Sequence, residues 1–172
     1  MKDEKVYQGP RGSGASLGLT GRWRLEKFAS RADYRRGRPY QVLEGKNLFL
    51  NAGKTEMWNL LIGASTNHYD ASNAQIGIGD DKTTSPDASQ TDLQGSQKTY
   101  KGMDSGYPAV SGASVEFRAT FGSDEANYEW GEFVVRHAAS GICLNRSTNG
   151  GAGWGTKSSG SVWTFTVTLT IS

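Results

Sequence analysis

Four aspartates near the middle of the chain are the first residues whose chemistry suggests a site. Asp80 and Asp81 follow a short apolar segment, and Asp87 and Asp92 lie in the polar stretch beyond it. Clustered carboxylates can bind Ca²⁺ when carbonyl oxygens complete the ligand shell. Their spacing does not match an EF-hand loop, and aspartates also favour turns by accepting hydrogen bonds from their own backbone. We therefore expect turns here rather than a metal site.

A second acidic group follows, with Asp124 and Glu125 in a turn and Glu129 and Glu132 beyond it. A glycosidase needs two carboxylates at a fixed separation, one of them with a raised pKa. In a strand, Glu132 shares a face with Tyr128 and Trp130, which predicts that one carboxylate is buried and paired. A hydrolase using Glu132 or Asp80 stays open as an alternative from another class. We expect acidic turns and no catalytic pair.

The remaining candidates for catalysis or nucleotide binding are weak. Cys143 is the only cysteine and lies between Ile142 and Leu144, which is typical of a small buried hydrophobe. Neither His68 nor His137 lies near it in the sequence to act as a base. The Gly77–Gly79 segment lacks the third glycine and the lysine of a phosphate-binding loop. We expect no enzyme activity and no cofactor.

The strongest binding signal is a set of arginines near the start of the chain. Residues 1–40 hold ten basic and four acidic residues, a net charge of +6, whereas residues 41–172 hold nine basic and thirteen acidic residues, a net charge of −4. This split favours an acidic partner for the basic part. Tyr34 and Tyr40 are interleaved with the arginines of residues 31–38, and basic residues mixed with aromatic ones also suit nucleic-acid binding. Because no recognised nucleic-acid-binding motif accompanies them, we favour a protein surface as the partner. The arginines expected to contact this partner are Arg22, Arg24, Arg31, Arg35, Arg36 and Arg38.

Trp154 is a further candidate contact because it lies in a glycine-rich segment, residues 147–160. An aromatic ring on a loop can stack on a sugar or pack on a neighbouring chain. The alternative is that Trp154 folds back onto its own sheet. The sequence leaves both possibilities open.

These candidates must be positioned mainly by strands. Alternating apolar residues predict a half-buried strand over 114–121 and another over 163–171, whose second face is all threonine. Further strands are expected near residues 75–79, 128–135 and 142–144, with a polar loop over 80–98. One short helix is expected over 52–61, capped by Asn51 and ended by Gly63, with Met57, Trp58, Leu61 and Ile62 packed on a sheet. A strand containing Trp23 and a basic loop over 31–38 precede them.

Composition agrees with a single turn-rich β domain. Hydrophobic residues make up 35% of the 172 residues and 23 residues are glycine. The longest apolar stretches, residues 48–50 and 60–64, are far shorter than the roughly 20 residues of a transmembrane helix. We predict a mainly β fold, a jelly-roll-like antiparallel sandwich over residues 46–172. The prediction also includes one short helix. Residues 1–45 are expected to form an extended basic N-terminal arm with the first strand or strands.

Several short motifs follow one another in a characteristic order and spacing. These motifs are residues 47–53, 75–80, 90–95, 117–121, 123–127, 130–133 and 144–146, with Lys157 and the threonine-alternating last strand. On this pattern, rather than on one signature, residues 46–171 resemble a widespread group of small virion proteins of tailed bacteriophages. The resemblance implies a β-sandwich that decorates capsids or forms part of tail fibres and appendages, and it implies no catalytic residue.

From the resemblance and the basic segment together we expect a virion structural protein, most simply a capsid decoration (cement) protein that binds and stabilises the assembled coat. The alternative is a tail fibre or tail-appendage component in which Trp154 and the 80–98 loop contact a host receptor. The expected partners are the major capsid protein or other virion proteins, and further copies of the chain through the threonine face or the Trp154 loop. Its expected location is the virion, after synthesis in the host cytoplasm, because no secretory signal opens the sequence. No membrane or nucleic-acid partner is expected.

Overall fold

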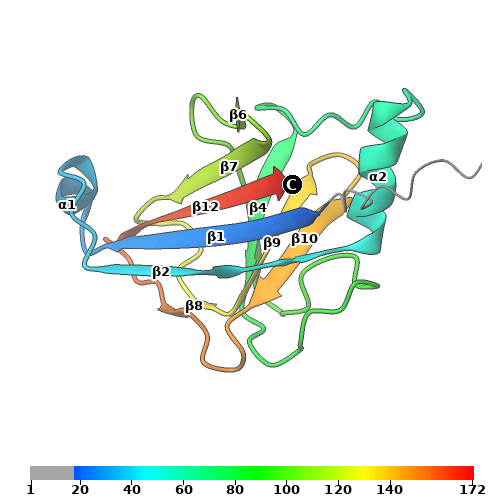
Figure 1. Ribbon diagram of the computed structural model, residues 1–172. Coiled ribbons are helices and arrows are strands. Elements are labelled where there is room, and N and C mark those ends of the chain that lie inside the picture. Colours follow the sequence, from blue (N-terminus) through cyan, green and yellow to red (C-terminus); the bar gives the residue numbers. More distant parts are fainter. Residues whose placement is uncertain (1–17) are drawn as a thin grey trace, which may run out of the picture.

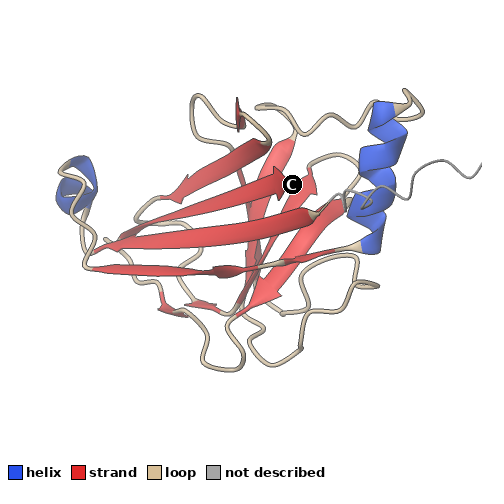
Figure 2. Ribbon diagram, viewed as in Figure 1, coloured by secondary structure: helices blue, strands red, loops and turns tan. Residues whose placement is uncertain are grey.

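The computed structural model describes residues 18–172 as two antiparallel five-stranded sheets packed face to face (Figures 1 and 2). Sheet A has the order β2 (Gln41–Lys46), β1 (Leu19–Phe28), β12 (Val162–Ile171), β7 (Ser114–Phe121) and β6 (Ala109–Ser111). Sheet B has the order β3 (Leu48–Phe49), β10 (Cys143–Thr148), β9 (Glu132–His137), β4 (Ala74–Gly79) and β5 (Lys98–Gly102). A small pair joins β8 (Glu129–Trp130) to β11 (Gly155–Thr156). The predicted mainly β sandwich is confirmed.

The core lies between the two sheets and is built around aromatic rings. Phe165 of β12 and Phe133 of β9 have ring centroids 4.5 Å apart, and Trp23 of β1 stacks on Phe165 at 5.8 Å. Alternation explains this arrangement, because every second residue of β7 and β12 points inward. The strands predicted over 114–121 and 163–171 are therefore confirmed together with their buried faces.

The first strands expected within residues 1–45 correspond to β1 and most of β2. β1 pairs with β12 along ten residue pairs and with β2 on its other side, so both strands belong to sheet A. Residues 1–17 of the predicted arm lie outside the described residues.

A second helix, α1 (Arg31–Arg35), stands where a basic loop was expected. Its N-cap is Ser30, whose hydroxyl oxygen accepts a hydrogen bond from the backbone N–H of Asp33 and donates one to the Asp33 carboxylate. This reciprocal capping stabilises a first helical turn. The prediction of only one helix was wrong because the Ser30–Asp33 capping interaction stabilises a helical turn within the basic segment.

The predicted helix near 52–61 is present as α2 (Asn51–Leu61), but its orientation differs from the prediction. Gly53 faces β10, where an added Cβ would come within 2.5 Å of the Leu144 Cα atom. This close approach turns Gly53 and Glu56 inward and leaves Trp58, Leu61 and Ile62 exposed. Only Met57 of the expected apolar face packs against the core. The N-cap is Leu50 rather than Asn51, whereas Gly63 ends the helix with a positive φ as expected.

Glu56 fastens α2 to the loop that follows it. Its carboxylate accepts hydrogen bonds from the Ser65 hydroxyl and the Asn67 amide, and these bonds lower the pKa of Glu56 below its usual value of 4.5. The stabilisation is complete above pH 4.5 and is lost as the pH falls through the lower folded pKa. Glu56→Gln should cost about 1 kcal/mol at pH 7. It should also flatten the fall in the free energy of unfolding between pH 5 and pH 3, measured by urea titration. Parallel pH curves for the two proteins would contradict this role.

Candidate docking surface

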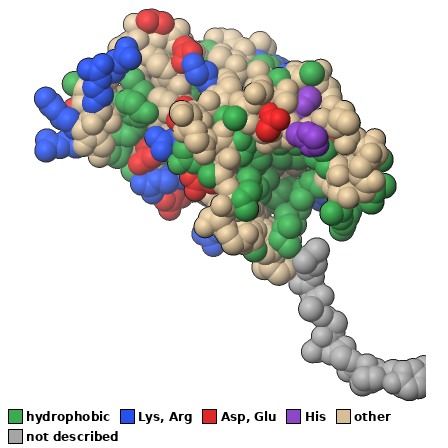
Figure 3. Space-filling model, turned by 90° about the horizontal axis from the view of Figure 1, so that it is seen from above, with side chains coloured by type: hydrophobic (Ala, Val, Ile, Leu, Met, Phe, Trp, Pro, Cys, Tyr) green, Lys and Arg blue, Asp and Glu red, His purple; other side chains and the backbone are tan. Residues whose placement is uncertain are grey.

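The predicted contact arginines are all exposed, and they form two separate groups. Four of them belong to the α1 segment, residues 31–38, which projects from one end of the sandwich (Figure 1). We call this segment the basic knob. Figure 3 shows blue side chains gathered at this end of the molecule. The arginines of the knob are Arg31, Arg35, Arg36 and Arg38.

The basic knob is held firmly although it is short. The Tyr34 ring packs edge-on against Phe28 with centroids 5.3 Å apart, and the backbone N–H of Arg38 donates to the Asp33 carbonyl oxygen. The next residues return to the sheet, where Tyr40 N–H bonds the Lys27 carbonyl oxygen. Within residues 18–172, no carboxylate forms an ion pair with any of the four arginines. The knob therefore presents uncompensated positive charge from a fixed backbone.

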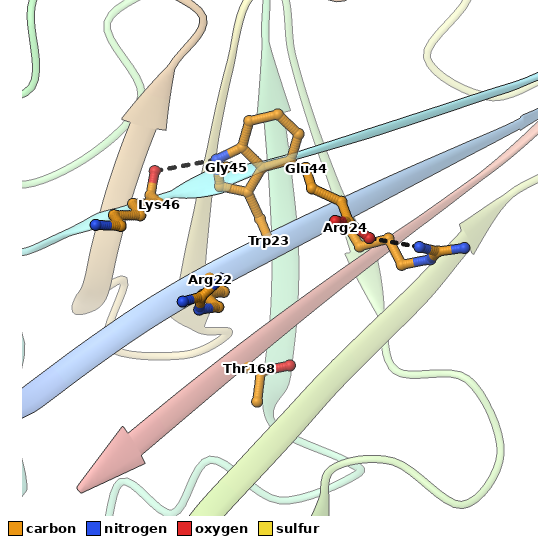
Figure 4. Close-up of a pocket in the computed structure, with 7 residues that line it drawn as sticks. All are labelled: Arg22, Trp23, Arg24, Glu44, Gly45, Lys46 and Thr168. Atoms are coloured by element: carbon orange, nitrogen blue, oxygen red, sulfur yellow. Dashed lines mark hydrogen bonds and ion pairs between the residues drawn. The ribbon is translucent and has the colours of Figure 1, made fainter. Parts of the chain in front are cut away.

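Arg22 and Arg24 lie apart from the knob, on the outer face of sheet A. They line an open hollow of about 410 Å³ with Glu44, Lys46 and Thr168 (Figure 4). Arg24 is bonded to Glu44 and Glu26, and the Glu44 hydrogen bond raises its pKa above the usual value. The charge of Arg24 is therefore compensated within the sheet, which makes it a weaker candidate contact than the sequence suggests.

Arg22 has a different neighbour, one that the sequence reasoning missed. It stands directly opposite Lys46 across the β1–β2 pair. Neither side chain has an ion-pair partner in the part of the chain that the structure describes. Like charges directly opposite in a sheet are unfavourable, so an anion placed between them would relieve that repulsion. Only the register of β1 with β2 brings Lys46 to this position, and no sequence spacing indicates it.

Trp154 is not an exposed contact. Its side chain is 2% exposed and lies against Trp23 and Phe165, with centroids 5.0 and 5.6 Å apart. Its carbonyl oxygen accepts a hydrogen bond from the buried Lys27 ammonium. Trp154 therefore folds back onto its own sheets, which is one of the two possibilities that the sequence leaves open. It is not available as the predicted partner contact, because the glycine-rich segment places its ring in the core.

Glu132 is buried and paired, as its strand position predicts, and its partner is the buried guanidinium of Arg146. The Arg146 Nε–H donates to Glu132 at 2.8 Å, and the Gly95 backbone N–H donates to the same carboxylate at 2.7 Å. Arg146 also donates to the Thr84 carbonyl oxygen and to Gln90, and it pairs with Asp81 at 3.0 Å. This network ties the 80–98 loop to sheet B. Both carboxylate oxygens of Glu132 accept hydrogen bonds from Arg146 or from the Gln94 and Gly95 backbone, which suits a role in holding the loop in place.

The aspartates of the 80–98 loop serve as local acceptors. Asp81 accepts from the Thr83 and Thr84 backbone N–H groups, Asp87 from Ser89, and Asp92 from the Tyr100 hydroxyl. These are the turn contacts that the sequence favours over a metal site. Among residues 18–172, no three acidic, histidine or cysteine side chains converge as metal ligands would.

Cys143 is fully buried, as expected of a small hydrophobe. Burial raises the pKa of its thiol to about 12, and the nearby Asp92 charge adds to this effect. His137 is bonded to Ser140 instead of the thiol. The Cys143 thiol is therefore kept in its protonated form, which is a poor nucleophile.

No protein-family model, curated protein or solved structure matches this chain. Within residues 18–172, no helix has both the length and the apolar character needed to cross a bilayer.

Proposed function

We propose that this protein is a non-enzymatic virion structural protein, a capsid decoration protein that docks on the assembled coat through its basic knob. The observation that carries the proposal is the set of four exposed arginines of the basic knob, none of which forms an ion pair within residues 18–172. Charged groups left unpaired on a fixed backbone favour a partner of opposite charge. The resemblance to small phage virion proteins supplies the setting, in which the acidic partner is the coat surface.

Docking of this kind requires binding alone and no catalytic step. A domain that binds assembled coat and not free subunits stabilises the shell by the free energy of binding. The sandwich suits such a role because its own fold is closed by a large aromatic core and by the Arg146 network. The partner would contact side chains that the fold itself does not use.

A tail location remains the rival. One of the two receptor contacts expected for it, Trp154, is buried. The other, the 80–98 loop, is fastened to the sandwich by Arg146 and keeps exposed residues that a receptor could contact.

The experiment is co-sedimentation of the purified full chain with assembled coat shells and, separately, with purified tails of the encoding phage. We expect saturable binding to shells that weakens as salt rises from 50 to about 500 mM, because exposed charge pairs are screened over about 10 Å or less. Binding to tails alone, or binding to shells that is insensitive to salt, would contradict the proposal.

A further inference from the structure

The end of the molecule opposite the basic knob carries an apolar groove. It has a volume of about 320 Å³ and lies where the two sheets open beneath α2. Its walls come from five strands and one helix, and they include Leu19 of β1, Met57 of α2, Val115 of β7 and Leu169 of β12. None of its lining residues is charged. Figure 3 shows hydrophobic side chains gathered around a hollow at this end.

Large hydrophobic side chains stand exposed around the groove. Val110 of β6 is 79% exposed and Ile171, at the end of β12, is 45% exposed, and both line the groove. On α2, one turn beyond Met57, Leu61 is 72% exposed, and Trp58 is 60% exposed. Contiguous exposed apolar surface of this kind marks an interaction site rather than ordinary surface composition.

We propose that a second copy of this chain covers this surface. Two identical surfaces can meet about a twofold axis only where their charges do not oppose each other, and the residues that line this groove are all uncharged. The surface also holds both halves of a self-complementary contact, since α2 projects Trp58 and Leu61 beside a hollow that can receive them. In addition, β6 pairs only with β7, so its outer backbone edge stays free among the described residues to meet the same strand of a partner.

The composition of the chain's own first 17 residues argues against them as the occupant. They join β1 at the groove, where Gly18 N–H bonds the Ser172 carbonyl oxygen. Besides Met1, however, their large apolar residues are only Val6, Tyr7 and Leu17, among five charged residues and three glycines. Such a sequence offers little apolar surface to match the groove. The two expected self-association surfaces also fit less well, because Trp154 is buried and two of the four threonine hydroxyls of β12, those of Thr164 and Thr170, bond within sheet A.

This inference does not depend on the virion setting. Pairing through the groove leaves both basic knobs free, because α1 and α2 lie at opposite ends of the sandwich (Figure 1). A dimer would present two knobs and could bind a repetitive surface with greater avidity than one copy.

Trp58 provides a direct readout for the test. It is the one exposed tryptophan of five, since Trp23, Trp130, Trp154 and Trp163 are each at most 5% exposed. Acrylamide quenching of the full chain therefore reports on Trp58. We expect sedimentation equilibrium to show a dimer, and quenching to fall as the dimer forms. The double variant L61S/V110S should raise the dimer dissociation constant at least tenfold and keep Trp58 quenched.

The matched control is Tyr40→Ser, which removes an aromatic side chain that is also 60% exposed but lies beside the basic knob. It should leave the dissociation constant unchanged. A monomer at 100 µM with Trp58 fully quenched would overturn the proposal. A monomer in which Trp58 is protected would also overturn the proposal, because it would assign the groove to the chain's own N-terminal residues. Equal effects of the double variant and of Tyr40→Ser on the dissociation constant would overturn it too.

Discussion

Replacing Arg146 by methionine is expected to cost about 3–5 kcal/mol of the free energy of unfolding, the largest effect of any single substitution considered for this chain. The Arg146 side chain is fully buried and donates to four groups, on Glu132, Thr84, Gln90 and Asp81. Methionine fills a similar volume but leaves the Glu132 carboxylate buried without its cation. Because the free energy of unfolding of a small domain is only about 5–15 kcal/mol, the variant should lose a large part of its stability.

The loss should be concentrated in the 80–98 loop. This loop has few residues in the main core, and its backbone is held by Arg146 through Thr84 and by Glu132 through Gln94 and Gly95. Urea unfolding gives the global effect, and limited proteolysis should cut the Arg146→Met variant within residues 80–98 well before the parent protein.

The control for Arg146 is Lys82→Met, which breaks the exposed Lys82–Glu129 pair in the same loop. Exposed pairs contribute less than about 1 kcal/mol, so this variant should unfold close to the parent. A cost below about 1 kcal/mol for Arg146→Met would show that the loop is held by other contacts.

The second large effect concerns binding. The variant R31E/R35E/R36E/R38E should bind coat shells about 100-fold more weakly at low salt. Each exposed charge pair contributes less than about 1 kcal/mol, and about 1.4 kcal/mol corresponds to a tenfold change in affinity. The four side chains are exposed and unpaired within residues 18–172, so the fold should be unaffected. Equal melting temperatures for variant and parent would establish this.

A matched pair of single variants separates the basic knob from net charge. Arg35→Glu and Lys54→Glu change the net charge equally, and both side chains are exposed, but Lys54 lies on α2 at the opposite end. We expect about threefold weaker binding for Arg35→Glu and no measurable change for Lys54→Glu. Equal weakening would mean that only the overall charge of the protein matters.

The strands could be predicted where side-chain alternation is complete. In β12 the inward Trp163, Phe165 and Val167 alternate with threonines, and the two-residue period of a strand fixes which face is buried. Glu132 could be placed in the interior by the same reasoning. Its partner could not, because only the β9–β10 register, which places Arg146 opposite Val134, brings the guanidinium within reach of Glu132 two residues away on β9.

The errors have physical causes of the same kind. The apolar residues of α2 suggested a buried face, but tight contact at Gly53 sets the rotation of the helix and exposes Trp58 and Leu61. Likewise, glycines suggested an open loop around Trp154, whereas the cavity between the sheets accommodates its ring. Both outcomes depend on tertiary packing, which overrides local pattern.

The most direct test of the central claim is electron microscopy of coat shells incubated with the full-length protein, at a resolution that distinguishes the two ends of the sandwich. The account predicts density on the outer surface of the head, with α1 against the coat and α2 directed away from it. Density confined to the tail, or copies bound to the head with α1 facing solvent, would contradict it.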